Sequence, residues 1–176
     1  MTKFIMGALF LLVGSSAFAG LLLEPYVGYY SGKWTKGSCS CSVDQSGATY
    51  GARVGVESEG FMLGADAMSG SWADKNSPSD DETPSSVGAF IGYGGRSFRV
   101  YGGYGIASSL KQTSTGYNDT YTGTDYKIGV GFQIVPLIAF NIEYLNATYT
   151  KDSSGPLTNH MTSGMWGATL SIPADL

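Results

Sequence analysis

The chain has 176 residues with ten basic and fourteen acidic side chains, which gives a formal net charge of −4 at neutral pH. Charged residues make up only 14% of the chain, while glycine (26) and tyrosine (12) are abundant. The negative charge argues against nucleic acid as a partner, and the length favours a single domain.

The first nineteen residues have the features of a secretory signal peptide. Lys3 supplies a basic start, and an apolar stretch runs from Phe4 to Val13. That stretch is too short for a membrane-spanning helix, which needs ~20 residues. Ala17-Phe18-Ala19 offers small residues at the positions that a signal peptidase reads. We therefore expect cleavage after Ala19 and a mature domain over residues 20–176.

The mature part contains eight segments in which apolar and polar residues alternate with a period of two, and it has no helical periodicity. In chain order the predicted strands cover residues 23–30, 50–57, 61–68, 87–93, 98–106, 125–134, 138–144 and 165–172. The sixth is the clearest, with one face made of Tyr126, Ile128, Val130, Phe132 and Ile134. Successive side chains of a strand point to opposite faces, so each segment predicts one apolar and one polar wall.

The connections between these strands alternate in length. Those after the second, fourth and sixth strands are tight, at residues 58–60, 94–97 and 135–137. The other connections are long and polar, as at residues 73–85, which include Asp80, Asp81 and Glu82. This rhythm is typical of outer-membrane barrels. The sequence therefore predicts an all-β fold, an eight-stranded antiparallel up-and-down transmembrane β-barrel.

The polar faces decide between a membrane barrel and a soluble barrel of the same alternation. A surface in water usually carries roughly a quarter to a third charged residues. Here the polar faces of all eight strands carry only Glu24, Arg53, Glu57, Asp66, Arg99, Asp125, Lys127 and Glu143. Aromatic residues also gather toward both ends of the apolar faces, where a membrane barrel meets its two interfaces. We therefore expect the polar faces to line the interior and the apolar faces to contact lipid.

These eight charges form the candidate site. Three are basic and five are acidic, and a charge shielded from water must be paired or remain wet. One interpretation is a polar network that plugs the barrel, and the other is a narrow path for cations. An eight-stranded barrel has an interior just wide enough for side chains to fill, which favours the plug.

Two further motifs are weaker. Cys39 and Cys41 lie in the first long connection, where they form either a disulfide or an exposed pair of thiols. Two thiols are too few for a zinc site, so we expect no metal. His160 and Ser163 raise the alternative of a lipid-modifying enzyme. Residues three apart on a strand face opposite sides, and no carboxylate is placed to orient the imidazole. We therefore expect no catalytic residues and no cofactor.

The mature chain resembles the small eight-stranded outer-membrane barrels, a group that includes the membrane domain of outer membrane protein A and outer membrane protein X. The resemblance rests on the opening run Leu23-Glu24-Pro25-Tyr26-Val27-Gly28-Tyr29, on Gly-Tyr-Gly runs at residues 92–94 and 103–105, and on the strand rhythm. Many such barrels end on an aromatic residue, whereas this chain ends at Leu176.

The resemblance implies a location in the bacterial outer membrane and a structural or adhesin-like role presented by extracellular loops. The alternative is a narrow, porin-like channel for small solutes or ions. The expected partners are outer-membrane lipid and an extracellular surface ligand, with the barrel acting as a monomer.

Overall fold

The computed structural model describes residues 20–36, 41–75, 81–94, 97–114, 117–135 and 137–175. The long strands of this part are β1 (Gly20–Lys36), β2 (Cys41–Ser58), β3 (Phe61–Asp74), β4 (Asp81–Gly94), β5 (Phe98–Ser114), β6 (Tyr117–Val135), β7 (Ile138–Asp152) and β8 (Gly155–Ser171). A short strand, β9 (Ala174–Asp175), follows them. In the described ranges no helix has the length and apolarity to cross a membrane. The expected signal peptide at residues 1–19 lies outside them, so the boundary at residue 20 stays a prediction.

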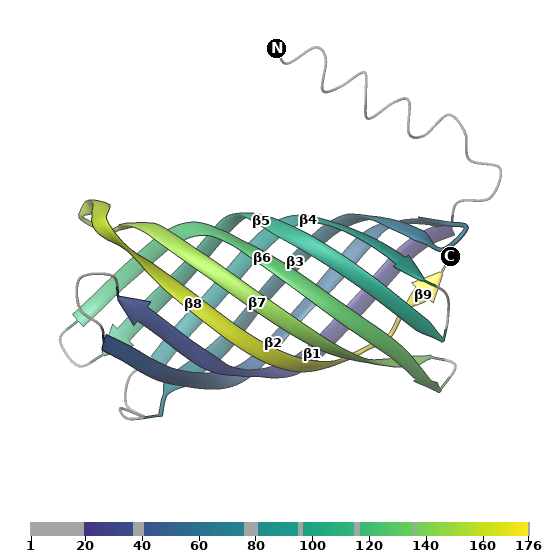
Figure 1. The fold of residues 1–176 in the computed structure, drawn as a ribbon, viewed down its shortest axis with the longest axis horizontal. Helices are drawn as coiled ribbons and strands as arrows, with labels where there is room; N and C mark the ends of the chain where they lie inside the picture. Colours follow the sequence, from purple (N-terminus) through teal and green to yellow (C-terminus); the bar gives the residue numbers. More distant parts are fainter. Residues whose placement is uncertain are drawn as a thin grey trace, which may run out of the picture.

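The strands close into a barrel (Figure 1). Each long strand pairs antiparallel with the next one in the chain, and β8 returns to pair with β1. When the hydrogen-bonded partners are followed once around the barrel from Tyr26, the path returns to β1 at Lys36, a stagger of 36 − 26 = 10 residues. A stagger of this kind requires strands that tilt strongly against the barrel axis. The predicted eight-stranded antiparallel barrel is confirmed.

The last strand is interrupted at Pro173. β8 ends at Ser171, and β9 then pairs with β1 through Ala174 and Leu23. Proline has no backbone N–H to donate to a ladder, so the strand breaks there and resumes on the same neighbour. The end of the described chain therefore continues the seam that closes the barrel.

The tight connections lie at one end of the barrel, which is the right-hand end in Figure 1. Between β2 and β3, Glu59 and Gly60 have φ angles of 51° and 82°. Positive φ at both central residues is the requirement of the type I′ turn, whose twist matches that of the flanking strands. The backbone N–H of Gly94 donates to the carbonyl of Gly60, which ties two neighbouring turns together.

On all eight long strands, the face that points outward is the apolar face that the sequence predicted. The exposed wall carries two belts of aromatic side chains. The lower belt, near the tight turns, includes Phe61 beside Tyr93 and Phe98 beside Phe132, with ring centroids 4.8 and 5.3 Å apart. The upper belt consists of Tyr29, Tyr50, Tyr104, Tyr126, Tyr144 and Trp166. The wall between the belts is apolar, as expected of a surface in contact with hydrocarbon.

The strands are longer than the sequence predicted, and the extra length lies on the far side of the upper belt. Residues 73–85 were expected to form a long connection, but β3 continues to Asp74 and β4 already begins at Asp81. A strand needs only ~9–11 residues to cross a bilayer. We call this part of the barrel the extension: residues 30–36, 41–49, 68–74, 81–86, 107–114, 117–124, 145–152 and 155–165.

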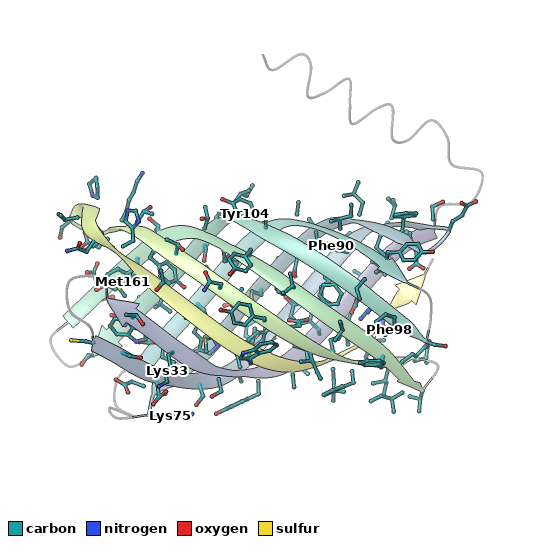
Figure 2. All side chains as sticks on the ribbon, viewed as in Figure 1. Lys33, Lys75, Phe90, Phe98, Tyr104 and Met161 are labelled. Atoms are coloured by element: carbon teal, nitrogen blue, oxygen red, sulfur yellow. The ribbon has the colours of Figure 1, made fainter. Side chains whose placement is uncertain are left out.

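The extension has the opposite polarity to the rest of the barrel. Its interior is filled by a cluster of buried apolar side chains, Tyr30, Met68, Trp72, Leu110, Tyr121, Leu145, Ala147, Tyr149, Met161 and Met165 among them. Its outer wall carries polar side chains such as Lys33, Lys111, Thr122 and Thr162. Met161 and Lys33 mark this end of the molecule in Figure 2. Between the belts the wall is apolar and the interior polar, whereas the extension is built like a protein in water.

Candidate functional site: the charged interior and the extension

Six of the eight predicted interior charges meet in one buried network between the two belts. They come from six strands and consist of Glu24, Arg53, Asp66, Arg99, Lys127 and Glu143. Alternation places each side chain on the inner face, and the stagger of the barrel brings distant strands together across the bore. Three cations and three carboxylates give the network a formal charge of zero.

Arg53 on β2 is at the centre of the network. Its guanidinium contacts Glu24 on β1 at 3.0 Å and Glu143 on β7 at 2.5 Å, and its Nε lies 3.8 Å from the carboxylate of Asp66. It also stacks over the rings of Tyr26 and Tyr101, with the guanidinium carbon 4.6 and 4.3 Å from the ring centroids. The planar, permanently charged guanidinium suits this combination of several carboxylates and aromatic faces.

Arg99 on β5 makes a second set of contacts nearer the tight turns. It holds both carboxylate oxygens of Glu24, with 2.8 Å between Nη1 and Oε2. Nη2 also donates to the side-chain oxygens of Asn141 and Ser171 at 2.8 and 3.0 Å. Glu24 is thus shared between two arginines, and β1, β5, β7 and β8 are joined across the bore. Charge-assisted contacts of this kind are roughly twice as strong as neutral ones.

Glu143 on β7 accepts hydrogen bonds from three further strands. Besides Arg53, its donors are the hydroxyls of Tyr30 on β1 and Tyr101 on β5, and that of Thr169 on β8 at 3.3 Å. The carboxylate has no exposed surface. A buried charge is tolerated only when it is paired and hydrogen-bonded, and Glu143 meets both conditions.

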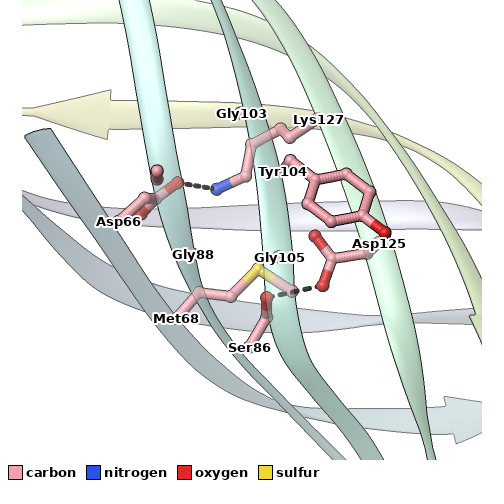
Figure 3. Close-up of a pocket in the computed structure, with 10 residues that line it drawn as sticks. Asp66, Met68, Ser86, Gly88, Gly103, Tyr104, Gly105, Asp125 and Lys127 are labelled. Carbon is pink, nitrogen blue, oxygen red and sulfur yellow. Dashed lines mark hydrogen bonds and ion pairs between the residues drawn. The ribbon is translucent and has the colours of Figure 1, made fainter. Parts of the chain in front are cut away.

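Lys127 on β6 completes the network. Its ammonium lies 2.5 Å from Asp66 and 3.1 Å from the hydroxyl of Tyr26, which itself donates to Asp66 at 2.8 Å. Asp125, two residues from Lys127 on the same inner face, is also buried, and it accepts a hydrogen bond from the hydroxyl of Ser86 at 2.5 Å. A hollow of about 10 Å³ lies between these two groups, room for about one water molecule (Figure 3). Asp125 therefore sits beside the network and not in it.

Glu57, the eighth predicted charge, is half-buried near the tight turn between β2 and β3. It shares the inner face with Arg53. The structure thus places all eight charges on inner faces, and six of them converge in the network.

The extension contains interior polar residues that the sequence interpretation missed. Glu82 is buried and accepts hydrogen bonds from Gln45 and Gln112, the latter at 2.7 Å. Trp72 donates to the hydroxyl of Thr49 at 3.1 Å. Asp119 accepts from the backbone N–H of Ser153 at 3.1 Å and from its hydroxyl. These residues were assigned to loops, although the alternation with period two continues through them. They are, in strand order, Gln45, Thr49, Trp72, Glu82, Gln112 and Asp119.

The weaker motifs are not brought together. His160 lies on the exposed outer face of β8, whereas Ser163 is buried on the inner face, as their spacing predicted. The last predicted strand began at residue 165, whereas β8 begins at Gly155 and therefore includes His160. Cys39 lies outside the described residues, so its pairing with Cys41 stays a prediction.

Comparison with known proteins gives a family and a fold. A family model described as the outer membrane protein beta-barrel domain matches residues 6–172. A search of curated proteins finds no match. Among solved structures, the chain is similar to Neisserial surface protein A, with 16% identity, a TM-score of 0.59, and 85% of this chain and 96% of that chain covered.

The chain is also similar to Ail, the attachment invasion locus protein of Yersinia pestis, with 15% identity and a TM-score of 0.59 over 87% of this chain and 99% of that one. A structure of Ail in complex with the heparin analogue sucrose octasulfate matches with 14% identity and a TM-score of 0.56, at the same coverage. At such identities the solved structures show a common barrel architecture.

Proposed function

We propose that this chain, which belongs to the outer membrane protein β-barrel domain family and therefore lies in the bacterial outer membrane, is a closed barrel. In this proposal the barrel presents a rigid interaction surface outside the cell. The observation that carries the proposal is the filling of the bore. The network of Arg53, Arg99 and Lys127 with their carboxylates occupies the interior between the belts, and the apolar cluster occupies the extension.

Because the interior is filled, we expect the outer wall of the extension to be the surface that binds a ligand. Outer-membrane barrels have their short turns in the periplasm, so the extension faces outward. Its strands remain paired well beyond the upper belt, for example Lys111 with both Thr83 and Thr120. A paired sheet holds its outward side chains in fixed positions, and a ligand that binds it does not first have to order a loop.

The name of one similar protein and the ligand bound to it also support an adhesin-like role. Ail is called an attachment invasion locus protein and has been crystallised with a sulfated sugar. The present chain shares the barrel, and its extension carries exposed lysines at positions 33, 111 and 151. We propose a non-enzymatic role, since His160 and Ser163 point to opposite sides of β8.

The proposal is tested by display on the surface of a non-adherent bacterium. Cells that express the full chain are expected to be retained on cultured epithelial monolayers above a vector control. A variant with Thr35, Thr83, Thr113 and Thr162 changed to glutamate on the outer wall of the extension should lose this retention and still reach the membrane. No retention by wild-type cells, together with increased uptake of small sugars, would instead support the channel alternative.

A further inference from the structure

The outer wall of β4 to β7 contains a hollow of about 450 Å³ immediately above the upper belt. It lies where three neighbouring ladders lose their regular register. Irregularities occur between Val87 and Gly88 in β4, between Gly105 and Ser108 in β5, and between Thr122 and Gly123 in β6. The extra residues lie in β5, at Ile106 and Ala107, and in β7, at Thr150, and bulges of this kind bend a strand and redirect its side chains.

The hollow has an apolar lower part and a polar upper part. Val87 and Ile106 form the lower part, and Ile106, at 72% exposure, is the most exposed large apolar side chain of the described residues. Hydroxyl groups form the upper part, with Ser85 and Ser109 hydrogen-bonded to each other at 2.8 Å and Thr122 beside them. Lys151 lies at the rim, and the lining contains no carboxylate.

The height of the hollow identifies the kind of molecule that it faces. Tyr104 and Tyr126 of the upper belt lie just below it, and aromatic belts mark the level of lipid headgroups. The apolar part of the hollow is therefore at the level where the acyl chains join the headgroup, and the hydroxyls and Lys151 are at the level of the headgroup itself. A basic pocket at this level is suited to an anionic headgroup, because an ammonium and several hydroxyls together bind phosphate oxygens.

We propose that this hollow binds a phosphorylated lipid of the outer leaflet, with its phosphate at Lys151, Ser109 and Thr122 and the start of its acyl chains on Val87 and Ile106. Farther down the same wall, a second hollow of about 660 Å³ lies around Gly102. Gly102 has no side chain on the lipid-facing side, and Ile91 and Ile128 flank the gap. An acyl chain that descends from the first hollow along β4 to β6 fits into this second one.

Native mass spectrometry of the detergent-solubilised full chain tests the proposal with lipid A as the probe. Bisphosphorylated lipid A is expected to bind one molecule per barrel, and the same lipid without its phosphates more weakly. Lys151→Gln should weaken binding by about tenfold, the effect of losing one hydrogen bond to a charged group. The matched control is Lys33→Gln, since Lys33 is an exposed lysine of the extension on the opposite wall, 3.7 Å from Asp44. That variant should bind as the wild type does.

A second variant tests the acyl part without changing charge. Gly102→Leu is expected to weaken lipid A binding, because its side chain fills the lower hollow. The barrel should still fold normally, because the added Cβ meets only ordinary contacts, at 3.7 Å or more. Equal loss in Lys33→Gln and Lys151→Gln would overturn the proposal, since it would mean attraction to any surface lysine. Equal binding of the lipid without phosphates, or a dimeric barrel that excludes lipid, would overturn it as well.

Discussion

At the scale of single residues, the stability of the interior depends on the pairing of each buried charge with a partner. Arg53 and Glu143 are both almost completely buried, and each contacts more than one partner of opposite or complementary character. Removing two charges from water costs several kcal/mol per ion, and a pair repays that cost only with good geometry and additional hydrogen bonds. The network provides both, so loss of one member leaves its partner uncompensated.

We expect Glu143→Gln to lower the free energy of unfolding by roughly 3–5 kcal/mol, because it leaves Arg53 with a buried, partly unpaired charge while keeping the shape of the side chain. Urea unfolding in lipid vesicles measures the change. Asp81→Asn is the matched control, since Asp81 is exposed on the extension, and it should have little effect. An equal, small effect of both substitutions would mean that the network contributes no stability.

The sequence predicted which charges face inward but not which of them meet. Alternation alone assigns Arg53 and Glu143 to inner faces. Their contact, however, joins β2 to β7 across the bore, and it depends on the stagger of ten residues and on the tilt that results from it. Asp125 illustrates the same limit, since it shares a face with Lys127 yet accepts its hydrogen bond from Ser86.

At the scale of strands, the main finding is that apolar residues change face at the upper belt. In β7 the apolar residues point outward up to Tyr144 and inward from Leu145 onward. The adjacent apolar residues Tyr144 and Leu145 therefore mark the point at which apolar side chains change from the outer to the inner face. Tyr29-Tyr30 and Met165-Trp166 mark the same point in β1 and β8. The sequence interpretation ended each strand where the outward apolar pattern ended, so it mistook the extension for loops.

This change of face predicts opposite responses to the same substitution on one strand. Val130 and Asn118 both point outward from β6, Val130 between the belts and Asn118 in the extension. Val130→Arg should destabilise the barrel in lipid by about 2–4 kcal/mol, whereas Asn118→Arg should be tolerated. Folding yield into vesicles, read from the shift in gel migration without boiling, distinguishes them. Similar yields for both variants would place the bilayer elsewhere along the strand.

The extension should also resist proteolysis, because a protease needs an unpaired segment of backbone. Lys111 lies within β5 and is paired on both sides, and Lys33 in β1 is paired with β2 and β8. Lys75 follows the end of β3. Trypsin added to intact cells is expected to cut after Lys75 and to spare Lys33 and Lys111, as peptide mapping would show. Rapid cleavage after Lys111 would show that the ladder is open there.

At the scale of the whole molecule, the barrel combines two kinds of protein along one axis. Between the belts it has the apolar outside and polar inside of a membrane barrel, and above them the polar outside and apolar inside of a protein in water. Leu22, Met62 and Phe90 add a small apolar cluster toward the tight turns. The bore is therefore filled in three successive layers, in keeping with the narrow interior of eight strands.

Conductance in a planar bilayer tests whether the interior of the barrel is closed. The wild-type barrel is expected to conduct almost nothing, because the layer around Arg53 and Glu143 blocks the bore between the belts. The double variant Arg53→Ser and Glu143→Ser removes both partners at the centre and should begin to leak, which serves as the positive control. Large, steady conductance of the wild type, with ion selectivity that Glu143→Gln merely changes, would contradict the closed barrel and support a channel.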